Sequence, residues 1–193
     1  MLAVLAVVVA WSAWQPHDWF TWVLETFPAW GGALLLIGLY PRWRFTDLAY
    51  SLMLVHAVIL CVGGKYTYAE VPLFNALRDA FDWDRNHYDR VGHFAQGFVP
   101  AIIAREVLIR RSPVKKGGWL FFVVGSICLA FSALYELFEW WTALASGAKS
   151  DAFLGTQGDP WDTQWDMALA LTGCILSQLT LAKLHDRHLK RLP

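Results

Sequence analysis

The sequence predicts an all-α, polytopic membrane protein: a single domain over residues 1–193, built as a bundle of about six transmembrane helices. Three observations support this class. Only 17% of the 193 residues are charged and 56% are apolar, whereas soluble domains carry about a quarter charged residues. Apolar segments long enough to span a bilayer recur along the chain. The chain also carries twelve tryptophans, which are enriched at membrane–water interfaces.

Three spans are predicted in the first third of the chain. Segment 2–14 would reach only about 20 Å as a helix, short of the ~30 Å hydrocarbon core, so we expect a short or tilted first helix. A signal peptide is the alternative, which the lack of a preceding basic residue disfavours. Segments 19–40 and 45–64 are long enough to cross, and a basic link at 41–44 separates them.

A polar stretch at 65–86 follows the third span. Its apolar residues recur at helical spacing: Leu73, Phe74, Leu77 and Phe81. This pattern predicts a short amphipathic helix lying on the membrane surface. Three further helices are expected over 87–111, 119–141 and from 159 to about 183, which completes the bundle.

The basic residues predict the topology. They gather in alternate loops and at the C-terminal end: Arg42, Arg44, Arg110, Arg111, Lys115, Lys116, Arg187, Lys190 and Arg191. The intervening loops are acidic or mixed. The positive-inside rule therefore places the basic loops and both termini in the cytoplasm.

Charge and cysteine content give no sign of nucleic-acid binding or of a cysteine metal site. The formal net charge is zero, so nothing indicates a nucleic-acid partner. Cys61, Cys128 and Cys174 all lie inside apolar segments, and their spacing matches no metal motif. We expect three buried free thiols.

Acidic residues and one histidine mark the outer ends of three predicted helices. They form pairs spaced three or four apart, each on one helix face: Asp89 with His93, Glu136 with Glu139, and Asp162 with Asp166. Carboxylates so close to hydrocarbon are costly and are usually functional. Because the topology puts all three helix ends on one side, we expect a single outward-opening pocket.

Helix-end chemistry can explain some of these residues without a site. Asp159, which precedes a proline, is typical of a helix N-cap, and Asp162 can complete that cap. Asp89 lies in a first turn, where the helix dipole favours an acid. Glu136 and Glu139 are predicted near a helix C-terminal end, where the dipole disfavours carboxylates by up to ~1 kcal/mol. They therefore point most strongly to a site.

Clustered carboxylates repel one another unless a positive group joins them. Arg90 and Lys65 are the candidate side chains. A divalent cation is a second possibility, because mostly oxygen ligands with one imidazole suit Mg, Mn or Ca, and also Zn with fewer ligands. The predicted ligands are Asp89, His93, Glu136, Asp162 and Asp166. Protonated acids that relay protons are a third possibility, and the spacing does not choose among the three.

The site residues lie in three motifs: YDRVGHFAQG at 88–97, LYELFEW at 134–140 and GTQGDPWDTQWDM at 155–167. These motifs resemble the YjdF-type bacterial inner-membrane proteins, which carry a domain of unknown function. The resemblance covers nearly the whole chain and implies a multi-pass protein of the bacterial inner membrane. More distantly, the order of Asp89, His93 and the later acids is similar to VanZ-like membrane proteins. Asp166 and Glu139 stand where that family usually has Asn and Gln.

The leading functional hypothesis is a metal-dependent site that acts on a lipid-linked phosphate or another envelope substrate. A divalent cation would polarise a phosphate or generate a hydroxide, with Glu139 or Glu136 as base. Arg90 and Lys65 would hold phosphate oxygens. The alternatives are an ion- or proton-coupled transporter and a non-catalytic protein that binds membrane lipids or a partner. Few polar residues continue toward the cytoplasmic half, which argues against a path through the bundle.

Overall fold

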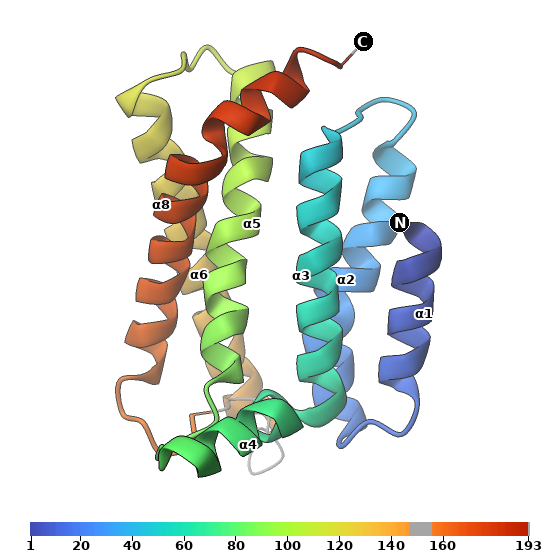
Figure 1. Cartoon of the computed structure of the whole chain (residues 1–193), viewed down its shortest axis with the longest axis vertical. Coiled ribbons are helices and arrows are strands. Elements are labelled where there is room, and N and C mark those ends of the chain that lie inside the picture. Colours follow the sequence, from blue (N-terminus) through green and yellow to red (C-terminus); the bar gives the residue numbers. More distant parts are fainter. Residues whose placement is uncertain (147–155, 193) are drawn as a thin grey trace.

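The computed structural model describes residues 1–146 and 156–192. Within these residues every element of secondary structure is a helix, and no strand is present (Figure 1). The elements are α1 (Leu2–Ala13), α2 (Trp19–Leu39), α3 (Asp47–Tyr66), the short 3₁₀ turn η1 (Tyr68–Glu70), α4 (Pro72–Phe81), α5 (Tyr88–Arg111), α6 (Gly118–Ser146) and α8 (Asp162–Leu189). The predicted all-α class is confirmed.

Four of the described helices are long and apolar enough to cross a membrane: α2, α3, α6 and α8. The other two predicted spans do not meet both criteria. α1 has 12 residues, which reach about 18 Å, and it lies beside only the half of the bundle next to α4 (Figure 1). α5 has 24 residues but carries His93, Gln96, Arg105 and Glu106 in its interior, which makes it too polar to meet the composition criterion. Length and composition therefore support four spans of the predicted six.

The sixth predicted helix begins later than expected. α8 starts at Asp162, with Trp161 at the N-cap position. Asp159 Oδ1 instead accepts the backbone N–H of Trp161 (2.9 Å) in a turn that precedes the helix. The predicted N-cap role of Asp159 is therefore wrong, because this turn holds the aspartate outside the helix.

The fifth predicted helix ends later than expected. α6 continues to Ser146, so Glu136 and Glu139 lie about two turns or more before its end. The helix dipole acts on charges only within the last turn. The dipole penalty that the sequence suggested for these two glutamates is therefore wrong, and burial makes them costly instead.

The predicted amphipathic helix is present as α4 and lies across one end of the bundle (Figure 1). Pro72 opens it and Asp82, in the left-handed conformation (φ 53°), ends it. Leu73 and Phe81 are exposed, as expected for a helix on a membrane surface. We call this the α4 end of the molecule. The opposite end carries the α2–α3 and α5–α6 loops with their arginines and lysines, and we call it the basic end (Figure 1).

α5 packs against α3, α6 and, most extensively, α8. Two glycines let α5 and α8 meet backbone to backbone. A Cβ added at Gly97 would overlap the main-chain carbonyl of Ala170, and one added at Gly173 would overlap that of Phe94. Small residues at such contacts are what allows helices to approach closely in membranes.

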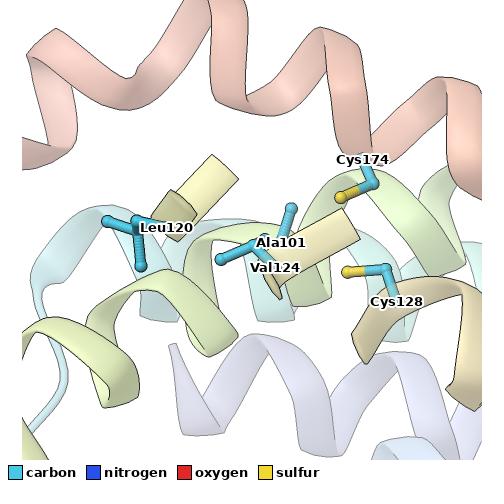
Figure 2. Close-up of a cluster of buried hydrophobic side chains, with 5 residues drawn as sticks. All are labelled: Ala101, Leu120, Val124, Cys128 and Cys174. Atoms are coloured by element: carbon cyan, nitrogen blue, oxygen red, sulfur yellow. The ribbon is translucent and has the colours of Figure 1, made fainter. Parts of the chain in front are cut away.

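A compact apolar core fills the space between α5, α6 and α8 beside this contact. Its buried members are Ala101, Leu120, Val124, Cys128 and Cys174 (Figure 2). The sulfur atoms of Cys128 and Cys174 face each other across α6 and α8 (Figure 2). These two cysteines and Cys61 are free and buried, which confirms the predicted buried thiols.

A buried ionic network that the sequence did not reveal ties the helices together at the basic end. Glu106 of α5 is completely buried. Its carboxylate accepts the backbone N–H (3.1 Å) and the hydroxyl (2.7 Å) of Thr46, which caps the start of α3. It also accepts a hydrogen bond from Arg110 (2.7 Å) and lies 3.0 Å from His185 Nε2 of α8. One side chain thus joins α3, α5 and α8.

The proton on His185 can be assigned from its neighbours. Arg105 Nη1 lies 2.8 Å from His185 Nδ1, and a guanidinium group can only donate. Nδ1 is therefore the acceptor, and Nε2–H donates to Glu106 Oε2. Both oxygens of Glu106 have donors, so this network is fully hydrogen-bonded, which is the condition under which a buried ionic group is tolerated.

We expect Glu106→Ala to lower stability by about 3–5 kcal/mol, because it leaves the buried partners of a broken ion pair unmatched. The measurement is the thermal midpoint in detergent micelles. Asp79→Ala, at an exposed aspartate paired with Arg78 at the surface, is the control and should melt close to the wild type, because such surface pairs contribute at most about 1 kcal/mol. A Glu106→Ala protein that melts together with this control would contradict a role of the network in stability.

We expect Gly97→Ala to force α5 and α8 apart and to cost about 1–3 kcal/mol, as overpacking does. Gly125→Ala on α6 is the matched control, because nothing lies within 4 Å of a Cβ added there. The readout is again the thermal midpoint. Equal midpoints for the two variants would show that α5 and α8 do not meet backbone to backbone in micelles.

Candidate functional site

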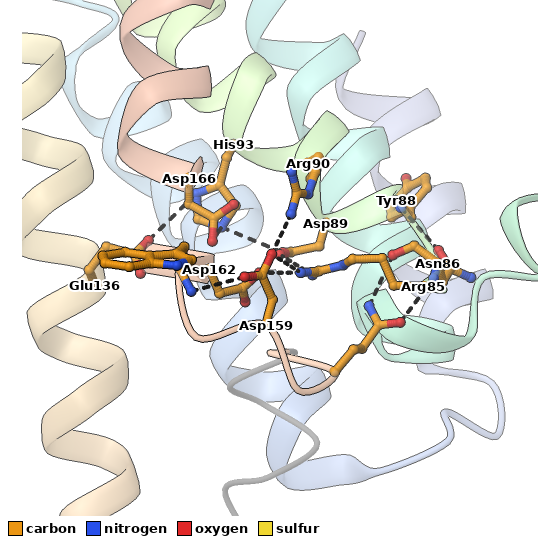
Figure 3. A network of polar contacts seen from close by, with 12 residues as sticks. Arg85, Asn86, Tyr88, Asp89, Arg90, His93, Glu136, Asp159, Asp162 and Asp166 are labelled. Atoms are coloured by element: carbon orange, nitrogen blue, oxygen red, sulfur yellow. Dashed lines mark hydrogen bonds and ion pairs between the residues drawn. The ribbon is translucent and has the colours of Figure 1, made fainter. Parts of the chain in front are cut away.

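Three helices bring the predicted acidic residues and histidine together at the α4 end (Figure 3). The residues come from the first two turns of α5, from α6 and from the first two turns of α8. All six are buried: Asp89, His93, Glu136, Glu139, Asp162 and Asp166. We call this set the acid–histidine cluster.

Arg85 supplies positive charge to the cluster, although the sequence analysis did not single it out. It lies just before α5, buried, and its guanidinium group makes a close ion pair with Asp162. The same group lies 3.7 Å from Asp89 Oδ2 and 3.5 Å from Asp159 Oδ2. The signal that could have found it is its position four residues before Asp89, the spacing of an ion pair on one helix face.

Arg90 was predicted to join the cluster and lies at its edge. Its Nη2 pairs with Asp159 Oδ2 at 2.8 Å. Its guanidinium group also lies 5.2 Å from the centre of the Trp165 ring, a cation–π distance. Asp159 therefore bridges two arginines (Figure 3).

Asn86 fixes the segment that carries Arg85. It is completely buried, and its Oδ1 accepts the backbone N–H of Tyr88 (3.0 Å) at the start of α5. Its Nδ2 donates to the carbonyl of Val71 (3.1 Å) and to Asn75 (2.8 Å) of α4. Its backbone exchanges two hydrogen bonds of 2.9 Å with the side chain of Gln157. Arg85 is thus held from both neighbouring segments.

A glycine-rich loop, Gly155-Thr156-Gln157-Gly158, precedes Asp159 in the sequence. Gly155 lies outside the described residues. In the described part, Gln157 uses its side chain on Asn86, and Gly158 adopts a positive φ of 85°. The observed role of Gln157 is therefore to hold the start of α5.

His93 presents one nitrogen to two carboxylates. Its Nδ1 lies 3.0 Å from Gln96 Oε1, and an amide oxygen only accepts, so Nδ1 carries the proton. Nε2 then faces Asp89 Oδ1 at 3.5 Å and Asp166 Oδ2 at 3.8 Å. In histidines that bind metals, the ring nitrogen that does not contact the metal typically donates a hydrogen bond.

The spacing of these three residues suits an ion between them. One ligand atom each from Asp89, His93 and Asp166 lies within 4.8 Å of the others. The separations of 3.5 and 3.8 Å exceed a good N–H···O hydrogen bond. Ligand atoms bound at about 2.0–2.2 Å to one cation lie roughly 3–4 Å from each other. These residues could therefore hold a divalent cation.

Two buried oxygens of the cluster have no hydrogen-bond partner within the described chain. They are Asp166 Oδ1 and Glu136 Oε1. Asp166 is only 2% exposed, and Glu136 Oε1 lies 3.7 Å from His93 Nδ1. An unmatched buried acceptor costs about 1–3 kcal/mol, and more when it is charged. A cation bound here would remove that cost.

Glu139 faces a cavity instead of the ion pairs. The cavity has a volume of about 510 Å³, and Asp89, His93, His56 and Glu25 line it together with Glu139. Glu25, on α2, is buried and accepts a hydrogen bond from the Tyr135 hydroxyl (3.4 Å). The sequence analysis did not include Glu25 in the site.

Lys65 is not brought into the cluster. Its ammonium group donates to the carbonyls of Trp11 (3.3 Å) and Trp14 (2.5 Å) at the end of α1. It also lies 5.0 Å from the centre of the Trp11 ring. Lys65 therefore hydrogen-bonds the last carbonyls of α1, as basic groups at helix C-termini do. Arg85 occupies the position in the cluster that the sequence analysis suggested for Lys65.

The comparisons with known proteins agree with the membrane character of the chain. The family model described as "Predicted membrane protein (DUF2238)" matches residues 1–187. The chain is 45% identical to "Inner membrane protein YjdF" of Escherichia coli (strain K12) over 187 residues, which cover 97% of this chain and 90% of the relative. No solved structure matches the chain.

These matches confirm the YjdF-type resemblance and the predicted location as a multi-pass protein of the inner membrane. Neither the family model nor this relative is described as VanZ-like. The more distant VanZ-like similarity therefore stays a prediction.

His87, just before α5, yields a pH prediction. Partial burial, with Arg90 and Arg85 nearby, lowers the pKa of this imidazole below its usual value. Since the folded-state pKa is the lower one, protonation favours the unfolded state. The contribution of His87 to stability is complete above the unfolded pKa of ~6.5 and is lost as the pH falls from there toward the folded-state pKa.

We therefore expect His87→Gln to reduce the fall in thermal midpoint between about pH 7 and pH 5. His17→Gln, at an exposed histidine, is the control and should keep the wild-type pH profile. Parallel profiles for wild type and His87→Gln would contradict the prediction.

Proposed function

We propose that this chain, which belongs to the DUF2238 family of predicted membrane proteins, holds a divalent cation in the acid–histidine cluster and acts on a phosphate-bearing lipid or envelope substrate. The observation that carries the proposal is the meeting of Asp89, His93 and Asp166 within 4.8 Å. Asp166 Oδ1, nearly completely buried, lacks a partner in the described chain. A polar site with unmatched acceptors in the low-dielectric interior calls for a cation.

The proposed ligands differ in whether another side chain already binds them. Asp89, His93 and Asp166 form the central group, and Glu136 lies next to it with its own unmatched oxygen. Asp162 is ion-paired with Arg85, so it would not bind the cation directly and would instead help to orient the site. Oxygen ligands with one imidazole favour Mg, Mn or Ca over a structural Zn site.

The remaining residues have separate proposed roles. Such a cation would act as a Lewis acid on a phosphoryl oxygen. Glu139, buried on the cavity wall, is placed to accept a proton from attacking water. Arg90, partly exposed and already paired with Asp159, can hold a phosphate oxygen with the edge of its guanidinium group.

The proposal includes an orientation in the membrane. The basic end carries Arg42, Arg44, Arg110, Arg111, Lys115 and Lys116, so the positive-inside rule makes it cytoplasmic. The C-terminus then lies in the cytoplasm and the acid–histidine cluster faces outward. In this arrangement α2, α3, α5, α6 and α8 cross the bilayer. The 12 residues of α1 enter it from the outer side to about half its depth, so the proposal does not place the N-terminus in the cytoplasm, as the sequence analysis did.

Transport is less well supported by the same geometry. A path through the bundle needs polar groups near the cytoplasmic side that can still form hydrogen bonds or bind ions. The Glu106–His185 network lies there, but its donors and acceptors are matched. It is suited to holding helices together and not to passing ions.

Metal content is the first test. Wild-type protein purified in detergent should retain a divalent cation and should melt at higher temperature with one of Mg, Mn, Ca or Zn added. His93→Ala and Asp166→Asn should weaken metal binding by more than the ~10–100-fold that loss of an outer partner costs. Asp79→Asn, at an exposed aspartate, should bind metal like the wild type. A wild-type protein with no metal and no metal-dependent shift would refute the site.

Glu139→Gln separates binding from turnover. This variant should keep the metal but release phosphate from a lipid phosphate in vesicles about 10²–10⁴-fold more slowly, the range typical of a lost general base. If wild type and variant both bind metal and neither releases phosphate, the cluster is a non-catalytic binding site.

A further inference from the structure

The cavity beside the acid–histidine cluster continues far along α5. Its polar wall lies at the α4 end, where Glu25, Asp89, His93 and Glu139 face it. Beyond them the wall becomes mostly apolar, with Pro28 of α2, Leu60 of α3, Phe131 of α6, and Ile103, Val107 and Leu108 of α5, although His56 of α3 and Gln96 of α5 also line it. We call this space the lateral groove.

The groove is deeper than one leaflet of a bilayer. Its lining on α5 runs from Asp89 to Leu108, a distance of about 28 Å along the helix. The hydrocarbon core of a bilayer is about 30 Å thick, so a single leaflet contributes about 15 Å. A chain lying along the whole groove must therefore reach well past the bilayer midplane.

The groove opens sideways toward lipid. Phe131 is 62% exposed and Val107 40% exposed, and Pro28 is exposed as well. These residues belong to α6, α5 and α2, whose outer faces meet lipid in a membrane protein. α2 and α6 make no extensive backbone contact in the described residues, and the hydrogen bond from Tyr135 to Glu25 joins them beside the polar wall. The exposed residues Phe131, Val107 and Pro28 mark where the groove is open. A hydrocarbon chain can enter from the bilayer without crossing water.

From this geometry we infer that the lateral groove seats the hydrocarbon chain of the substrate, and that the substrate is a phosphate lipid with one chain longer than a leaflet. The inference rests on the proposed function, because a cation in the acid–histidine cluster and Arg90 would hold the phosphate. The volume of about 510 Å³ and the mostly apolar wall with few polar groups are typical of ligand sites. An ordinary two-chain phospholipid would leave the deep part of the groove unfilled.

The test compares three probes: a long-chain polyprenyl phosphate, a short-chain prenyl phosphate with the same head group, and a two-chain phospholipid. Binding to the full-length protein in detergent is measured by native mass spectrometry. Val107→Trp fills the deep part of the groove from an exposed position, so it should not disturb the core. Val55→Trp is the matched control, because Val55 is also exposed (55%) and does not line the groove.

We expect the wild type to prefer the long-chain phosphate at least tenfold over the other two probes. Val107→Trp should remove that preference while leaving short-chain binding and metal content unchanged, and Val55→Trp should behave like the wild type. Unchanged long-chain binding by Val107→Trp, or a wild type that prefers the two-chain phospholipid, would overturn the inference. Metal binding without any lipid preference would overturn it and leave the metal site standing. Long-chain binding without metal would support the groove and refute the metal site.

Discussion

The close contact between α5 and α8 is the constraint on which the rest of the site depends. Gly97 lies against Ala170 where the two backbones meet. His93 precedes Gly97 by one turn, and Asp166 precedes Ala170 by the same number of residues. The contact therefore sets how far His93 Nε2 lies from Asp166 Oδ2, which is 3.8 Å. A bulkier residue at Gly97 or Gly173 would therefore change that distance without replacing either His93 or Asp166.

Charge balance divides the acid–histidine cluster into a part that arginines neutralise and a part that they do not. Asp162 and Asp159 lie against Arg85 and Arg90, and Asp89 lies partly within reach of Arg85. Glu136 and Asp166 retain buried oxygens without partners in the described chain. Like charges at such short range in a low-dielectric interior repel strongly. The part of the cluster away from the arginines is therefore where a bound cation would contribute most.

The two buried ionic networks show how similar residues serve different ends. At the basic end Glu106 receives hydrogen bonds from Thr46 and Arg110 and is paired with His185. At the α4 end His93 faces carboxylates at distances too long for good hydrogen bonds. The first network is complete without a ligand and stabilises the bundle. The second leaves two buried oxygens without hydrogen-bond partners in the described chain, and a mostly apolar groove adjoins it.

The sequence by itself determined the helical membrane class, the surface helix α4, and the acids and histidine that share helix faces, because hydropathy and 3–4 residue spacing are local properties. Only the tertiary structure decided which cation meets which acid. Arg85 replaces Lys65 because Asn86 holds its segment against α4 and Gln157. Glu25 joins the groove, and Glu106 meets His185, through contacts between residues 79 or more apart in the chain. Such pairings depend on how helices pack, and no local pattern in the chain records them.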